Sequence, residues 1–169
     1  MWAAERYLID AEAASCGDPE SVGRVARQTL RRVARVDLSE PGFALVRPGS
    51  DLSPARFRSL LVSLAEELDS AYGERFGRRL VLYWMGRFSQ QRTTEAHLDG
   101  APDESILILG YEPTEITSRL FVYDYARAAL DRSMQPKEFL ERLNPTFGEG
   151  RAAIEPYRTE IDRFDPRGV

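Results

Sequence analysis

The chain contains one histidine, His97, and an aspartate follows two residues later at Asp99. Side chains at positions i and i+2 of a β-strand lie on the same face of the strand. An imidazole and a carboxylate placed in this way could bind one ion together, because both groups are common ligands of divalent metals. Two other interpretations stay open. His97 could be a hydrogen-bonded structural histidine, and Asp99 could be a turn residue, since the dipeptide Asp99-Gly100 favours turns.

Other kinds of catalytic site have less support in the sequence. No Gly-x-Ser-x-Gly is present, which argues against a hydrolase with a nucleophile elbow. The sequence also has no Walker loop and no Gly-x-Gly-x-x-Gly, so phosphate binding by a glycine-rich loop is not indicated. Cys16 is the single cysteine, which excludes an internal disulfide and a zinc-binding cysteine cluster.

The composition is that of a water-soluble globular protein with one domain. The 169 residues are 43% hydrophobic and 30% charged, and we expect a single domain over residues 1–169. The net charge of -4 argues against binding to nucleic acid or to an anionic membrane. The N-terminal residues do not have the pattern of a secretory signal, and no apolar run is long enough to span a bilayer. We therefore expect a cytoplasmic protein, and its oligomeric state stays open.

Residues 1–77 have a mainly helical pattern. The sequence predicts a helix over Trp2–Ala14 and a second helix that Asp18 caps and Pro19 opens. A short strand is expected at residues 42–47. The clearest helix begins at Ser53-Pro54 and continues to Tyr72, with one apolar stripe that needs a flat surface to cover. That stripe consists of Phe57, Leu60, Leu61, Leu64, Leu68 and Tyr72.

Residues 79–164 have a mainly β pattern. The continuous apolar run Leu80–Met85 predicts a central strand that is buried on both faces. Three further strands, two short helices and a final extended segment are expected after it. The strands are Thr93–Asp99, Ser105–Tyr111 and Thr117–Asp124, the helices are Ala126–Arg132 and Pro136–Leu143, and the extended segment is Arg151–Phe164.

This order of a supporting helix, several strands, a His-x-Asp motif at the end of a strand and an arginine on a late strand resembles the 2-oxoglutarate/iron(II)-dependent oxygenase superfamily. The resemblance implies an α+β fold: a double-stranded β-helix, or jelly roll, with N-terminal helices packed on one sheet. It also implies Fe(II) and 2-oxoglutarate as cofactors. The reaction would be hydroxylation of a small molecule or a protein side chain.

The resemblance assigns the site residues by position. His97 and Asp99 would be two metal ligands, Glu149 the third, and Arg158 would bind the carboxylate of 2-oxoglutarate. The family's third ligand is a second histidine, which this chain lacks. The alternatives are a solvated Glu149 between two glycines and an Arg158 paired with a nearby carboxylate. At the level of function, they are an interaction module of the same fold without turnover, and a divalent-metal site that is not an oxygenase.

Overall fold

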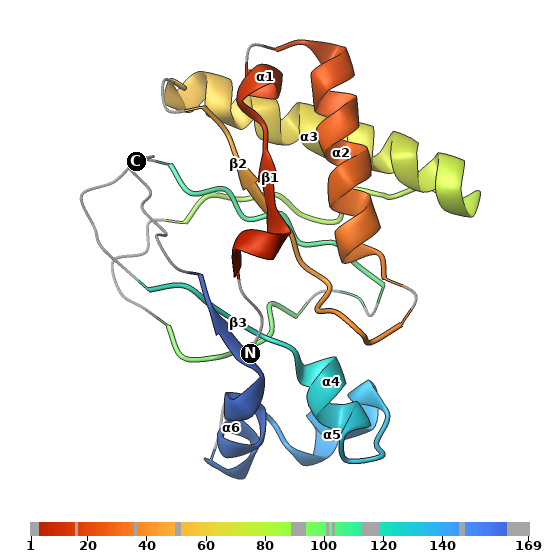
Figure 1. Cartoon of the computed structure of the whole chain (residues 1–169), viewed down its shortest axis with the longest axis vertical. Helices are drawn as coiled ribbons and strands as arrows, with labels where there is room; N and C mark the ends of the chain where they lie inside the picture. The colour runs from red at the N-terminus through yellow and green to blue at the C-terminus, as the bar shows by residue number, and fades with distance from the viewer. Residues whose placement is uncertain are drawn as a thin grey trace.

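The structure is a computed structural model that describes residues 4–15, 17–35, 37–49, 52–88, 94–100, 102, 104–112, 119–145 and 148–161. Figure 1 shows helices α2 and α3 at one end of the molecule and helices α4, α5 and α6 at the other. Along the chain the elements are η1 (Ala4–Tyr7), β1 (Leu8–Asp10), α1 (Glu12–Ser15), α2 (Pro19–Val33), β2 (Leu45–Arg47), α3 (Pro54–Phe76), β3 (Phe121–Tyr123), α4 (Tyr125–Leu130), α5 (Pro136–Arg142), α6 (Gly148–Ile154), η2 (Glu155–Tyr157) and β4 (Arg158–Glu160).

The two long helices begin where the capping residues predict. The Asp18 carboxylate accepts a hydrogen bond from the backbone N–H of Ser21 at 2.9 Å, and Pro19 opens α2. Ser53 and Pro54 do the same for α3, which ends at Gly77 with a φ of +66°. A left-handed residue at this position favours glycine, since it has no Cβ to clash. The predictions for both helices are confirmed, and α3 extends four residues beyond Tyr72.

The N-terminal half has its own hydrophobic core, formed by α2, α3 and a parallel pair of strands. Strands β1 and β2 pair with Leu8 opposite Leu45. The strand predicted at residues 42–47 is confirmed for residues 45–47. The helix predicted over Trp2–Ala14 is wrong for residues 8–10, and its residues 2 and 3 lie outside the described part of the chain. Residues 8–10 form a strand because β2 supplies a pairing partner and Ile9 is buried in the core. The buried members of this core are Ile9, Ala11, Ala14, Val22, Val25, Ala26, Leu30, Leu64, Leu68 and Ala71.

The C-terminal half has a second, smaller core around Phe139, which is fully buried. Strands β3 and β4 pair antiparallel, and α4, α5 and α6 pack beside them. The two predicted short helices are confirmed as α4 and α5, with slightly different ends. The extended segment Arg151–Phe164 is wrong up to Tyr157, because residues 148–157 are helical. Of the described residues that follow, Arg158–Glu160 form a strand, and residues 162–164 lie outside the described part of the chain.

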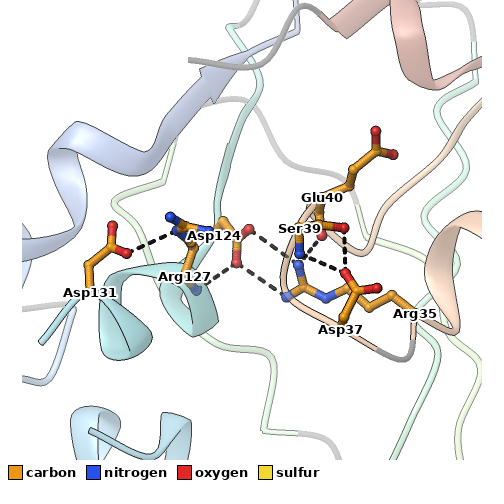
Figure 2. A network of polar contacts seen from close by, with 7 residues as sticks. All are labelled: Arg35, Asp37, Ser39, Glu40, Asp124, Arg127 and Asp131. Carbon is orange, nitrogen blue, oxygen red and sulfur yellow. Dashed lines mark hydrogen bonds and ion pairs between the residues drawn. The ribbon is translucent and has the colours of Figure 1, made fainter. Parts of the chain in front are cut away.

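An ion pair with little exposure joins the two halves (Figure 2). The guanidinium of Arg35, just after α2, contacts both carboxylate oxygens of Asp124 at 3.2 and 3.3 Å. The Asp124 carboxylate also caps α4 by accepting from the backbone N–H of Arg127 at 3.1 Å. Only 4% of the Asp124 side chain is exposed, so this contact is shielded from water far better than a surface ion pair.

The predicted double-stranded β-helix is wrong. The chain is α+β, but the strands of its described residues form only two sheets of two strands each, and each strand is three residues long. The apolar stripe of α3 explains the difference. Its members Leu60, Leu64, Leu68 and Tyr72 belong to the core that α3 forms with α2, so the stripe does not cover a jelly-roll sheet. Within the described ranges, no helix is long and apolar enough to cross a membrane.

Candidate functional site

The segment that follows α3 exposes an unusual amount of apolar surface. Residues 81–88, here called the apolar segment, contain no helix, turn or bend and belong to neither sheet. Their six large apolar side chains are 61–84% exposed. The prediction that Leu80–Met85 is a buried central strand is therefore wrong. These six residues are Val81, Leu82, Tyr83, Trp84, Met85 and Phe88.

The start of the apolar segment is anchored to α3 by one carboxylate. Asp69 accepts hydrogen bonds from the Arg79 guanidinium at 2.9 Å and from the backbone N–H of Leu80 at 2.8 Å. Leu80 itself packs against the N-terminal core. Val81, immediately after the anchored Leu80, is 84% exposed.

A second segment without helix, turn or bend, residues 105–112, also belongs to neither sheet. Two ion pairs connect the segments: Arg78 lies 2.9 Å from Glu104, and Arg87 lies 3.1 Å from Glu112. Arg78 and Arg87 are nine residues apart, and their partners Glu104 and Glu112 are eight residues apart in the same order. This spacing is expected where two extended chains run in parallel. Ile106 packs on the N-terminal core, whereas Leu107 and Leu109 are more than half exposed. The predicted strand Ser105–Tyr111 is not part of either sheet.

His97 and Asp99 do come together, as their spacing predicts. The Nε2 atom of His97 lies 3.1 Å from Oδ1 of Asp99, and both side chains are about half exposed. The predicted strand Thr93–Asp99 is nevertheless not observed in its described residues, 94–99. The contact forms in a loop. The negative charge of Asp99 also acts on Tyr111, whose pKa is raised by burial first and by Asp99 second.

Two contacts fix the orientation of the His97 ring. Nδ1 donates to the backbone carbonyl oxygen of Glu95 at 2.7 Å, because a carbonyl oxygen can only accept a hydrogen bond. Nε2 is then the ring nitrogen that faces the Asp99 carboxylate.

The remaining residues predicted for a metal centre do not join this pair. Glu149 lies in α6 with an exposed side chain, and no group of three His, Cys, Asp or Glu side chains among the described residues is placed to hold a metal. The predicted three-ligand metal-binding site is therefore wrong for the described part of the chain. The loop position of His97 and Asp99 supplies two ligands only, and these do not fit an iron centre of the expected kind.

Arg158, predicted to bind 2-oxoglutarate, lies at the start of β4. Its guanidinium is 2.7 Å from Glu155 and stacks on the Phe121 ring, 4.9 Å from the ring centroid. The Glu95 side chain is 3.3 Å from Arg151 of α6. Glu95 thus orients His97 through its backbone carbonyl and not through its carboxylate.

Comparison with protein-family models, with curated proteins and with solved structures finds no match to this chain. The resemblance to the oxygenase superfamily therefore rests on the sequence features alone.

The Asp69 anchor predicts acid sensitivity. The Arg79 guanidinium lowers the pKa of Asp69 below its ordinary value of 3.8, and the hydrogen bond from the Leu80 N–H lowers it further. A carboxyl group whose pKa falls on folding stabilises the fold above its ordinary pKa, and this contribution is lost as the pH falls through the lowered value. We expect Asp69→Asn to be less stable than the wild type at pH 7, and the difference to shrink below about pH 4.

Urea unfolding of both proteins at several pH values measures this effect. Arg79→Met should show the same pH dependence, because it removes the charge that lowers the pKa of Asp69. A stability difference that stays constant with pH would contradict the anchor.

Proposed function

We propose that this chain is a protein-binding module that recognises an extended apolar partner segment through its own apolar segment. The observation that carries the proposal is the 61–84% exposure of six large apolar side chains within eight residues. Large contiguous apolar patches on soluble proteins mark interaction sites, because leaving them in water is unfavourable.

The backbone of the apolar segment indicates the mode of binding. The segment contains no helix, turn or bend and belongs to neither sheet, so its backbone can pair with a strand of another molecule. Peptides bind to such edges by adding a strand: backbone hydrogen bonds supply affinity and side-chain contacts supply specificity. Its Val, Leu, Tyr, Trp and Met side chains are mostly of the β-branched and aromatic types that favour strands.

The proposal predicts that a hydrophobic dye binds at this surface. We expect 1-anilinonaphthalene-8-sulfonate to fluoresce with the native wild-type chain, and the signal to fall several-fold in Trp84→Glu. Leu130→Glu is the matched control, since Leu130 is an exposed leucine at the end of α4, in the other half of the molecule. Equal dye binding in Trp84→Glu and the wild type would show that the apolar segment is not the binding surface.

A further inference from the structure

We infer that the partner of the apolar segment is a second copy of this chain, bound by antiparallel pairing of the two apolar segments about a two-fold axis. This inference rests on the proposed function and adds the identity of the partner. Three features of the segment are relevant: its exposed area, the charges at its ends, and the register in which two copies of it can pair.

The exposed area matches that of a stable dimer. Aromatic side chains have areas of roughly 150–250 Å². At the observed exposures, the six apolar side chains leave on the order of 800 Å² open to solvent. A standard interface buries about 800 Å² on each partner, whereas the largest patch on a typical monomer is roughly 300–600 Å². The segment alone therefore offers enough area for one half of a standard interface.

The charges around the segment do not select a charged partner. Arg79 is paired with Asp69, Arg78 with Glu104, and Arg87 with Glu112. With these guanidinium groups neutralised within the chain, neither an acidic peptide nor an anionic membrane gains a strong attraction. The favoured partner is apolar and extended, and a second copy of the chain carries such a segment.

Antiparallel pairing of two identical segments gives the best overlap when Tyr83 lies opposite itself. In this register Val81 of one copy faces Met85 of the other, and Leu82 faces Trp84. Arg79 then faces Arg87, which would be unfavourable for bare charges. The pairing remains acceptable because Asp69 and Glu112 supply a carboxylate to each of the two arginines.

Sedimentation equilibrium of the full chain tests the inference. We expect a monomer–dimer equilibrium, from 19.2 kDa to twice that mass, with a Kd of about 1–10 µM. Trp84→Glu and, separately, Tyr83→Glu should weaken the dimer by about 100-fold, because each places a charge in an apolar interface. Leu130→Glu should leave the Kd unchanged. Far-ultraviolet circular dichroism below the Kd establishes that each variant is folded.

A disulfide experiment tests the register without a destabilising charge. In an antiparallel pair, directly opposed residues have Cα atoms about 4.5–5.5 Å apart, which suits a disulfide. Tyr83→Cys in a Cys16→Ser background should therefore oxidise to a covalent dimer, and Leu130→Cys in the same background should not.

Three results would overturn the inference: a chain that stays monomeric at about 100 µM, a dimer that neither Tyr83→Glu nor Trp84→Glu weakens, or binding of the monomer to vesicles of neutral phosphatidylcholine through the same residues. Dye binding distinguishes a failure of the dimer inference from a failure of the proposed function. A monomer whose apolar segment still binds the dye leaves the proposed function standing, whereas a monomer without dye binding at that segment rejects both.

Discussion

Replacing Arg35 by methionine is expected to lower the free energy of unfolding by about 3 kcal/mol, because it leaves the carboxylate of Asp124 without its main cationic partner in a poorly hydrated position. The Asp124 side chain is 4% exposed and that of Arg35 is 23% exposed. Arg35 also donates to the backbone carbonyl of Glu40, so it fixes the loop after α2 as well. Methionine keeps much of the aliphatic length and removes only the charge and the donors.

The matched control is Arg142→Met, which breaks an exposed ion pair with Glu138 inside α5. We expect a loss of no more than about 0.5 kcal/mol there. A double-mutant cycle with Asp124→Asn should give a coupling energy of about 1–2 kcal/mol. Equal stability losses for Arg35→Met and Arg142→Met in urea unfolding would show that the contact between the two halves is not stabilising.

Phe139→Ala is expected to destabilise the C-terminal half by about 3–5 kcal/mol, because it removes a fully buried ring and leaves a cavity. Phe139 is the largest buried side chain of the second core, and Arg132 lies over its ring at 5.7 Å from the centroid. Few other buried groups are present in this core to compensate for the loss.

Phe139→Leu should cost about 1–1.5 kcal/mol, since it keeps most of the apolar volume. Leu130→Ala, at an exposed position of the neighbouring helix, should stay within about 0.5 kcal/mol. Thermal or urea unfolding measures all three. A loss below 1 kcal/mol for Phe139→Ala would mean that this half contributes little to the cooperative stability of the chain.

Local signals in the sequence predicted the helices but not how they pack. Asp18-Pro19 and Ser53-Pro54 located the starts of α2 and α3, because caps and N-terminal prolines act within one turn. The apolar stripe on α3 predicts that this helix covers a flat surface. It packs largely on α2, and periodicity alone does not distinguish a helix that covers a sheet from one that covers another helix. The double-stranded β-helix was implied by the resemblance to the oxygenase superfamily, and it is wrong because the described strands form two sheets of two strands each.

For the candidate site too, the sequence predicted a local contact but not the packing of the surrounding segments. The i, i+2 spacing correctly predicted that His97 and Asp99 lie close together, although the contact forms in a loop and not on a strand. The continuous run Leu80–Met85 was interpreted as a buried strand, because an apolar run normally indicates burial. The composition of this run does not indicate whether the layer that buries it belongs to the same chain or to another molecule.

The most direct test of the binding surface is hydrogen–deuterium exchange of the full chain, measured by mass spectrometry at a concentration well below the expected dimer Kd. Residues 81–88 pair with no described strand, so we predict that their amides exchange rapidly while those in the middle of α3 remain protected. At high concentration, protection should appear in residues 81–88. Protection of these residues as strong as that of α3 in the dilute monomer would contradict the account, because the apolar segment would then be paired within its own chain.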